Sequence, residues 1–177
     1  MITQATIADA AELSALINSA YRGETSKKGW TTEADLLEGT RTSEEELISI
    51  IASSNHYLLK FIRDEKIIGS VLLIAKKEVL YLGMLTVSPE LQNSGIGKQL
   101  LQAAEQHAQQ LELSRIQMTV IGIRKELLAW YIRNGYEDTG VLEPFPFGEG
   151  DKALTSEPLD FIVLEKNYPK SITFLKK

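Results

Sequence analysis

The sequence has no cysteine, which excludes disulfide bonds, thiolate metal sites and a cysteine nucleophile. It also lacks any apolar run of the roughly 18 residues that a membrane-spanning helix needs, and its amino terminus has no basic flank. No long basic run is present and the formal net charge is −5, which argues against a nucleic-acid surface or an anionic membrane patch. These absences predict a soluble, cytoplasmic protein that binds neither nucleic acid nor membrane, and the acidic balance suits a cationic substrate.

Repeats, low-complexity tracts and linkers rich in glycine, serine or proline are absent as well. With 44% hydrophobic residues, the chain can bury a substantial core, so we expect one domain over residues 1–177. The two histidines, His56 and His107, are far apart in the chain and belong to no ligand cluster. The sequence therefore predicts no metal site.

Small helices are expected to follow a first strand in the amino-terminal third. Thr6 with Asp9, and Ser43 with Glu46, have the spacing of capping boxes, so each pair predicts the start of a helix. The elements expected here are a strand over 2–5, a helix after Asp9, a loop over 22–31, a short helix over 32–38 closed by Gly39, and a helix after Ser43.

Three strands are expected next, over 56–63, 66–75 and 79–87, and their short connections indicate an antiparallel meander. The third run, VLYLGMLTV, is apolar nearly throughout, which is typical of a central strand covered on both faces. Gly83 within it suggests a bulge or a close approach of another backbone.

The second half of the chain alternates helices with strands. A helix over 95–111 followed by a strand over 115–121 has the length of a right-handed parallel crossover. Further elements expected are a helix over 125–133, a short strand over 136–138 and a last strand over 159–165. The fold predicted is α/β, with a mixed central sheet of about six to seven strands, an antiparallel meander plus a parallel crossover, and helices on both faces.

A glycine-spaced turn between Val87 and Gly97 precedes the helix over 95–111. Unpaired amides in such a turn and at a helix start can hold phosphate. A nucleotide-hydrolase loop would need a glycine at Gln92 and a hydroxyl residue at Gln99. A dinucleotide fingerprint would need a third glycine at Leu100. Spacing therefore excludes both motifs.

The remaining pattern is the turn Gln92-Asn93-Ser94-Gly95-Ile96-Gly97 after a strand that ends in Val87-Ser88-Pro89. It resembles the pyrophosphate loop of the GNAT superfamily of acyl-CoA-dependent N-acyltransferases, (Q or R)-x-x-G-x-(G or A) after V-x-P. The resemblance covers nearly the whole chain, including the segments 2–6, 129–136 and 161–166.

This resemblance implies that coenzyme A binds through main-chain groups. Its pyrophosphate would contact the amides of Gln92, Asn93, Ser94, Gly95, Ile96, Gly97 and Lys98. Its pantetheine arm would pair like an added strand with the main chain of Leu85, Thr86 and Val87. A bulge near Gly83 would help to part the neighbouring strands, and amides of this strand would stabilise an oxyanion.

The segment 129–136 is similar to the family's helix ending L-Y-x-x-x-G-(F or Y), and Tyr131 matches the tyrosine that assists the leaving sulfur. Tyr131 also shares an apolar helix face with Leu127 and Leu128, so packing is the alternative role. Many members have an asparagine where this chain has Arg124, which could bind a phosphate or face solvent. The strand over 79–87 offers no carboxylate, so no general base is identified.

On the acceptor side, family position indicates Trp30 and Glu33 between the early helices, and Phe145 and Phe147 on a proline-rich lid. Each has an alternative role: Trp30 can close the core, Glu33 can stabilise a helix start, and the two phenylalanines can plug the sheet edge. Acidic residues near the lid, namely Glu143, Glu149 and Asp151, could attract a cationic amine.

The resemblance implies an N-acetyltransferase that moves an acetyl group from acetyl-CoA, without a metal, to a primary amine by direct attack in a ternary complex. The acceptor would be a small molecule or a peptide, and a homodimer is the default assembly. The alternatives are a non-catalytic acyl-CoA-binding or regulatory module on the same fold, and transfer of a longer acyl group.

Overall fold

The computed structural model describes residues 1–148 and 151–169. Its main sheet has seven strands in the order β1-β3-β4-β5-β6-β9-β7, in which only β5 and β6 run parallel. The strands are β1 (Ile2–Gln4), β3 (His56–Arg63), β4 (Lys66–Ala75), β5 (Leu80–Val87), β6 (Arg115–Ile121), β9 (Phe161–Asn167) and β7 (Glu137–Glu143). The predicted mixed sheet is confirmed, with the predicted meander and the parallel crossover in place.

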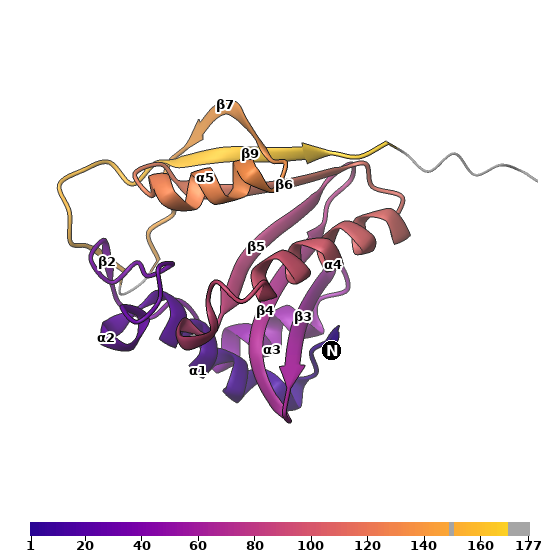
Figure 1. Ribbon diagram of the computed structural model, residues 1–177, viewed down its shortest axis with the longest axis horizontal. Helices are drawn as coiled ribbons and strands as arrows, with labels where there is room; N and C mark the ends of the chain where they lie inside the picture. Colours follow the sequence, from indigo (N-terminus) through magenta and orange to yellow (C-terminus); the bar gives the residue numbers. More distant parts are fainter. Residues whose placement is uncertain (149–150, 170–177) are drawn as a thin grey trace, which may run out of the picture.

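Helices cover both faces of this sheet (Figure 1). One core cluster joins β3, β4, β5 and β6 to α4 (Ile96–Gln110) and α5 (Lys125–Arg133). A second cluster joins the opposite face to α1 (Ala10–Tyr21) and α3 (Glu44–Ala52). Short helical segments are η1 (Ile7–Asp9), α2 (Gly23–Ser26) and η2 (Pro89–Leu91). In the part of the chain that the structure describes, no helix combines the length and apolarity needed to cross a membrane.

Both predicted capping pairs mark helix starts. The Asp9 carboxylate accepts hydrogen bonds from the Thr6 amide at 2.7 Å and from the Thr6 hydroxyl at 3.0 Å. The Ser43 hydroxyl accepts from the Glu46 amide at 3.1 Å, whereas the Glu46 carboxylate accepts from the Thr42 hydroxyl. The second pair therefore caps α3 from one side only.

The short helix predicted over 32–38 is wrong. Its place is taken by a turn and by β2 (Leu37–Glu38), which pairs with β8 (Lys152–Ala153). Leu37 is 2% exposed because it packs with Ile121 and Leu159, and these distant contacts override local helix propensity. The expected loop over 22–31 contains α2, and β7 extends beyond the predicted short strand to Glu143.

The bulge expected near Gly83 is present in β5. Between the pairs Ser70–Thr86 and Leu72–Gly83, β5 has one residue more than β4. The residue in the left-handed region is Met84, with φ of 46°. The bulge reverses the alternation of side chains: Leu80 and Leu82 belong to the α4 core, Met84 to the opposite core, and Leu85 and Val87 again to the α4 side.

The parallel strands β5 and β6 separate soon after they begin. They are paired at Leu80–Ile116 and Tyr81–Gln117 only, while β6 stays paired with β9 along its whole length. Figure 1 shows the two strands spreading apart below α5. The edge of β5 that faces β6 is consequently open from Leu82 to Val87.

Candidate active site

The turn at the end of β5 presents backbone amides at the start of α4. Gly95 has a φ of 82°, which favours glycine, and a Cβ atom added there would meet nothing within 4 Å. The first main-chain bond of the helix runs from the Gln99 amide to the Gly95 carbonyl at 3.1 Å. The amides of Ile96, Gly97 and Lys98 therefore have no helical partner, which is the arrangement that binds anions at helix starts.

Gln92 holds this turn against the loop after α2. Its side-chain oxygen accepts from the Trp30 amide at 2.7 Å, and its side-chain nitrogen donates to the Thr31 hydroxyl at 2.7 Å and to the Val87 carbonyl at 3.3 Å. A Cβ atom on Gly29 would lie 2.6 Å from the Gln92 oxygen, so glycine is needed for this approach. The side chain of Gln92 thus braces the site, and only its main chain is free for a ligand.

A cavity of about 310 Å³ opens between this turn, the end of β5 and α5. The predicted cofactor residues that line it are Leu85, Val87, Gln92, Asn93, Gly95, Ile96, Gly97 and Lys98. Two others do not line it. The hydroxyl of Ser94 donates to the Leu91 carbonyl, and Thr86, which is 1% exposed, pairs with Ser70 of β4.

The end of β5 offers main-chain groups to this cavity. The Ser88 amide donates to the Ile68 carbonyl at 2.9 Å, and alternation along an antiparallel ladder then turns the polar groups of Val87 away from β4. The Leu85 carbonyl accepts a hydrogen bond from the hydroxyl of Tyr21, at the carboxyl end of α1. Because the Leu85 and Val87 carbonyls each have a protein donor, the main-chain amides of this edge are the groups left for an extended ligand.

Tyr131 lies on α5 where two cavities meet, since it lines both. Its ring packs edge-to-face on Trp130 at 5.0 Å and on Tyr136 at 5.9 Å, and the side chain is 6% exposed. Burial, and next the nearby Tyr21, raise the pKa of the Tyr131 hydroxyl well above its usual value. The hydroxyl therefore stays protonated at neutral pH and can donate a hydrogen bond.

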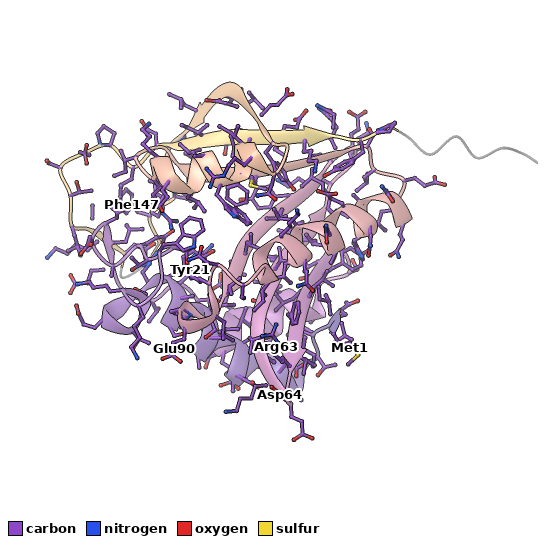
Figure 2. All side chains as sticks on the ribbon, viewed as in Figure 1. Met1, Tyr21, Arg63, Asp64, Glu90 and Phe147 are labelled. Atoms are coloured by element: carbon purple, nitrogen blue, oxygen red, sulfur yellow. The ribbon has the colours of Figure 1, made fainter. Side chains whose placement is uncertain are left out.

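The second cavity, of about 190 Å³, lies on the other side of the β5 bulge. It shares Tyr21, Leu85, Leu127 and Tyr131 with the first cavity. Figure 2 shows Tyr21 near the middle of the molecule, between the helices that precede β3 and the spread strands. A molecule in the second cavity can therefore reach one in the first beside Tyr131.

Buried charges line this second cavity. The two carboxylate oxygens of Glu33 pair separately, one with Arg22 at 3.3 Å and the other with Arg124 at 3.1 Å. Arg22 also lies 3.4 Å from Asp151, and Arg124 donates to the Thr31 carbonyl at 2.5 Å. Arg124 thus neither lines the phosphate turn nor faces solvent, because its side chain is 10% exposed and bound to Glu33.

Three of the four predicted acceptor residues line one of the two cavities, and Phe147 lines neither. Glu33 and Phe145 line the second cavity, and Phe145 packs on Phe161 at 5.3 Å. Trp30 lines the first cavity, edge-to-face with Trp130 at 6.1 Å. Phe147 packs on Phe145 at 4.8 Å and is 54% exposed.

Of the acidic residues considered near the lid, Asp151 pairs with Arg22 and Glu143 is exposed on β7. Glu149 lies outside the described residues. The carboxylates of Glu33 and Asp151 therefore contact arginines of the protein.

The sequence did not predict that Tyr21, Arg22 and Arg41 line the second cavity. It also did not predict the ion pair between Arg124 and Glu33. Tyr21 continues the apolar face of α1, so its pattern indicates packing. The arginines stand in loops or at helix ends, where arginine is usually solvated. No signal in the sequence distinguished them, because their partners come from distant segments.

A family profile and several solved structures match this chain. The profile of the Acetyltransferase (GNAT) family matches residues 14–136. No curated protein was found to match. Among solved structures, the chain is similar to the PaiA N-acetyltransferase of Thermoplasma acidophilum in complex with coenzyme A, with 21% identity, a TM-score of 0.70, and coverage of 95% of this chain and 98% of that one.

Two further structures share the fold. The ribosomal-protein-S18-alanine N-acetyltransferase of Escherichia coli has 13% identity and a TM-score of 0.72, over 100% of this chain and 99% of that one. A GNAT family acetyltransferase of Elizabethkingia anophelis, with acetyl-CoA bound, has 20% identity and a TM-score of 0.57, over 71% and 83%. Since the family profile spans most of the chain, this protein belongs to the GNAT family of acetyltransferases.

Proposed function

We propose that this protein transfers an acetyl group from acetyl-CoA to a primary amine by direct attack within a ternary complex. The observation that carries the proposal is the meeting of two cavities at the open edge of β5, where both are lined by Tyr131. One cavity has an anion-binding turn at its end, and the other is lined by charged side chains. Such a junction can hold a donor and an acceptor in contact.

The residues of the first cavity fit coenzyme A. The amides of Ile96, Gly97 and Lys98 are unpaired, and the open space around Gly95 admits a pyrophosphate. The open edge at Leu85 and Val87 can pair with the amide groups of the pantetheine arm. Acetyl-CoA, when bound, supplies an acetyl group activated as a thioester.

The protein's own groups then act on the reaction in three ways. The two cavities place a neutral amine next to the open edge of β5. This placement supplies much of the rate enhancement. Main-chain amides at this edge stabilise the negative charge that develops on the carbonyl oxygen. Tyr131 donates a hydrogen bond to the departing sulfur, and its raised pKa favours this role over complete proton transfer.

A thiol-release assay over a panel of primary amines tests the proposal, after calorimetry has established acetyl-CoA binding. Release of coenzyme A with formation of an N-acetyl product is expected for at least one amine. Binding without release on every amine would instead indicate a non-catalytic acyl-CoA module, and competition by longer acyl-CoA thioesters would reveal another donor. The single domain over 1–177, the cytoplasmic location and the homodimer stay predictions from the sequence.

A further inference from the structure

The second cavity, which would hold the acceptor, is lined by unequal numbers of positive and negative side chains. Arg22, Arg41 and Arg124 line it, against Glu33 and Asp151. Among the described lining residues this is three guanidinium groups against two carboxylates. The described lining of the cavity therefore has an excess of positive charge, although the chain as a whole has a net charge of −5.

Both of these carboxylates are engaged with arginines. Glu33 bridges Arg22 and Arg124 with its two oxygens, and Asp151 lies 3.4 Å from Arg22. Arg22 and Glu33 are buried as whole residues, at 8% and 7% exposure. Such a buried pair is costly to break, so its carboxylate is poorly placed to receive an ammonium group from a substrate.

Arg41 is the remaining cation. Its guanidinium carbon lies 5.7 Å from the centre of the Tyr21 ring, and within residues 1–148 and 151–169 no carboxylate lies within ion-pair distance of it. The main-chain amide of Arg41 is held by the side chain of Asn18 at 2.7 Å, which fixes the residue at the cavity wall. A guanidinium group in this position matches a carboxylate in shape and charge.

Tyr21 connects Arg41 to the open edge of β5. Its ring faces Arg41, and its hydroxyl donates to the Leu85 carbonyl on the open edge of β5. An anionic group at Arg41 and an amine at Leu85 are thus separated by about one tyrosine side chain. The cavity of about 190 Å³ has room for about six waters at about 30 Å³ each, which suits a small molecule.

We propose that the acceptor is a small amino acid, whose carboxylate binds Arg41 while its amine attacks at the β5 edge. This inference rests on the proposed acetyl transfer and adds the chemical class of the acceptor. The excess positive charge has a second effect, because cations nearby disfavour the ammonium form of an amine. The same arginines that bind the carboxylate thereby favour the neutral, nucleophilic amine.

The test compares each proteinogenic amino acid with its carboxamide in the thiol-release assay, with rates expressed per concentration of neutral amine. That correction is needed because the carboxamide lowers the pKa of the amine. Wild-type protein should use at least one amino acid about ten-fold better in kcat/KM than its carboxamide, the factor typical of a charge-assisted hydrogen bond. Arg41→Gln should bring this ratio close to one, and Arg41→Lys should keep part of it.

Arg63→Gln is the matched control, since Arg63 lies at the far end of the β3–β4 hairpin (Figure 2). It should leave the ratio unchanged. Calorimetry provides a second readout: Arg41→Gln should bind coenzyme A like the wild type, which shows that it folds, but should bind the preferred amino acid about ten-fold more weakly.

Three results would overturn the inference. Wild-type protein that uses carboxamides or simple amines as well as amino acids would disprove the anionic acceptor and leave acetyl transfer intact. An acid-over-amide preference that survives in Arg41→Gln would remove Arg41 from recognition. The absence of thiol release with every amine, despite coenzyme A binding, would overturn the proposed function and this inference with it.

Discussion

Tyr131 is the side chain on which the proposed chemistry most depends. Its ring is buried among aromatic side chains, the residue lines both cavities, and its hydroxyl has no hydrogen-bond partner among the described residues. The sequence left two roles open, packing or assistance to the leaving group. The structure shows the packing role, since the ring contacts Trp130 and Tyr136, and the leaving-group role stays a proposal that is compatible with this packing.

Replacement of Tyr131 by phenylalanine should lower kcat about 10- to 100-fold, because a hydrogen bond to the departing sulfur is lost. Affinity for coenzyme A should change little, since the ring and its contacts remain. Steady-state kinetics and calorimetry measure the two effects. Tyr57→Phe, which alters a ring packed on His107, is the control, and an unchanged kcat in Tyr131→Phe would exclude the hydroxyl from the mechanism.

Glu33 is a second residue whose environment defines its role. Its substitution by glutamine should destabilise the protein by about 3 kcal/mol, because Arg124 loses its buried counter-ion while Arg22 keeps Asp151. Urea unfolding measures this change. Glu24→Gln is the control: Glu24 pairs with Lys27 at 2.8 Å but its side chain is 90% exposed, so the cost should be below about 0.5 kcal/mol. Equal stability of the two variants would contradict a bridging role for Glu33.

At the scale of elements, local pattern was a good guide wherever an element depends on its own residues. The crossover strand over 115–121 and the helix over 125–133 were predicted with the bounds that the structure has. The helix over 32–38 failed because Leu37 is buried by Ile121 and Leu159, which a local window cannot include. The bulge in β5 was indicated by Gly83, although the strained residue is its neighbour Met84.

The turn before α4 permits a matched pair of glycine variants. Gly95 and Gly140 both have positive φ, of 82° and 76°, and an added Cβ would meet nothing within 4 Å at either. Backbone strain should therefore be similar in Gly95→Glu and Gly140→Glu. Only Gly95→Glu places a carboxylate beside the unpaired amides, so only it should weaken coenzyme A binding, by about ten-fold or more.

Calorimetry with coenzyme A measures both variants. Retained affinity in Gly95→Glu would contradict the assignment of the pyrophosphate to this turn. An equal loss in both variants would attribute the effect to strain alone.

For the whole molecule, buried tyrosines tie stability to alkaline pH. Burial raises the pKa of the hydroxyls of Tyr21, Tyr131, Tyr136 and Tyr168. Below pH of about 10 these groups are protonated in both the folded and the unfolded chain. As pH rises above about 10, the unfolded chain loses protons that the folded chain keeps, so the free energy of unfolding falls.

Urea titrations between pH 8 and 11 should show this loss. Tyr136→Phe should reduce it, because one buried hydroxyl, unpartnered among the described residues, no longer resists ionisation. A free energy of unfolding that stays constant up to pH 11 would contradict the link between the buried tyrosines and alkaline stability.

By itself the sequence determined the strands of the main sheet, the glycine turn before α4 and the helix that carries Tyr131, because each depends on spacing within one short segment. Only the tertiary structure decided which residues line the second cavity. The parting of β5 and β6 depends on where pairing stops, and the charge of the second cavity depends on contacts among Arg22, Glu33, Arg124 and Asp151. These residues come from separate segments, so folding alone brings them together and leaves Arg41, among the described lining residues, as the cation without a carboxylate partner.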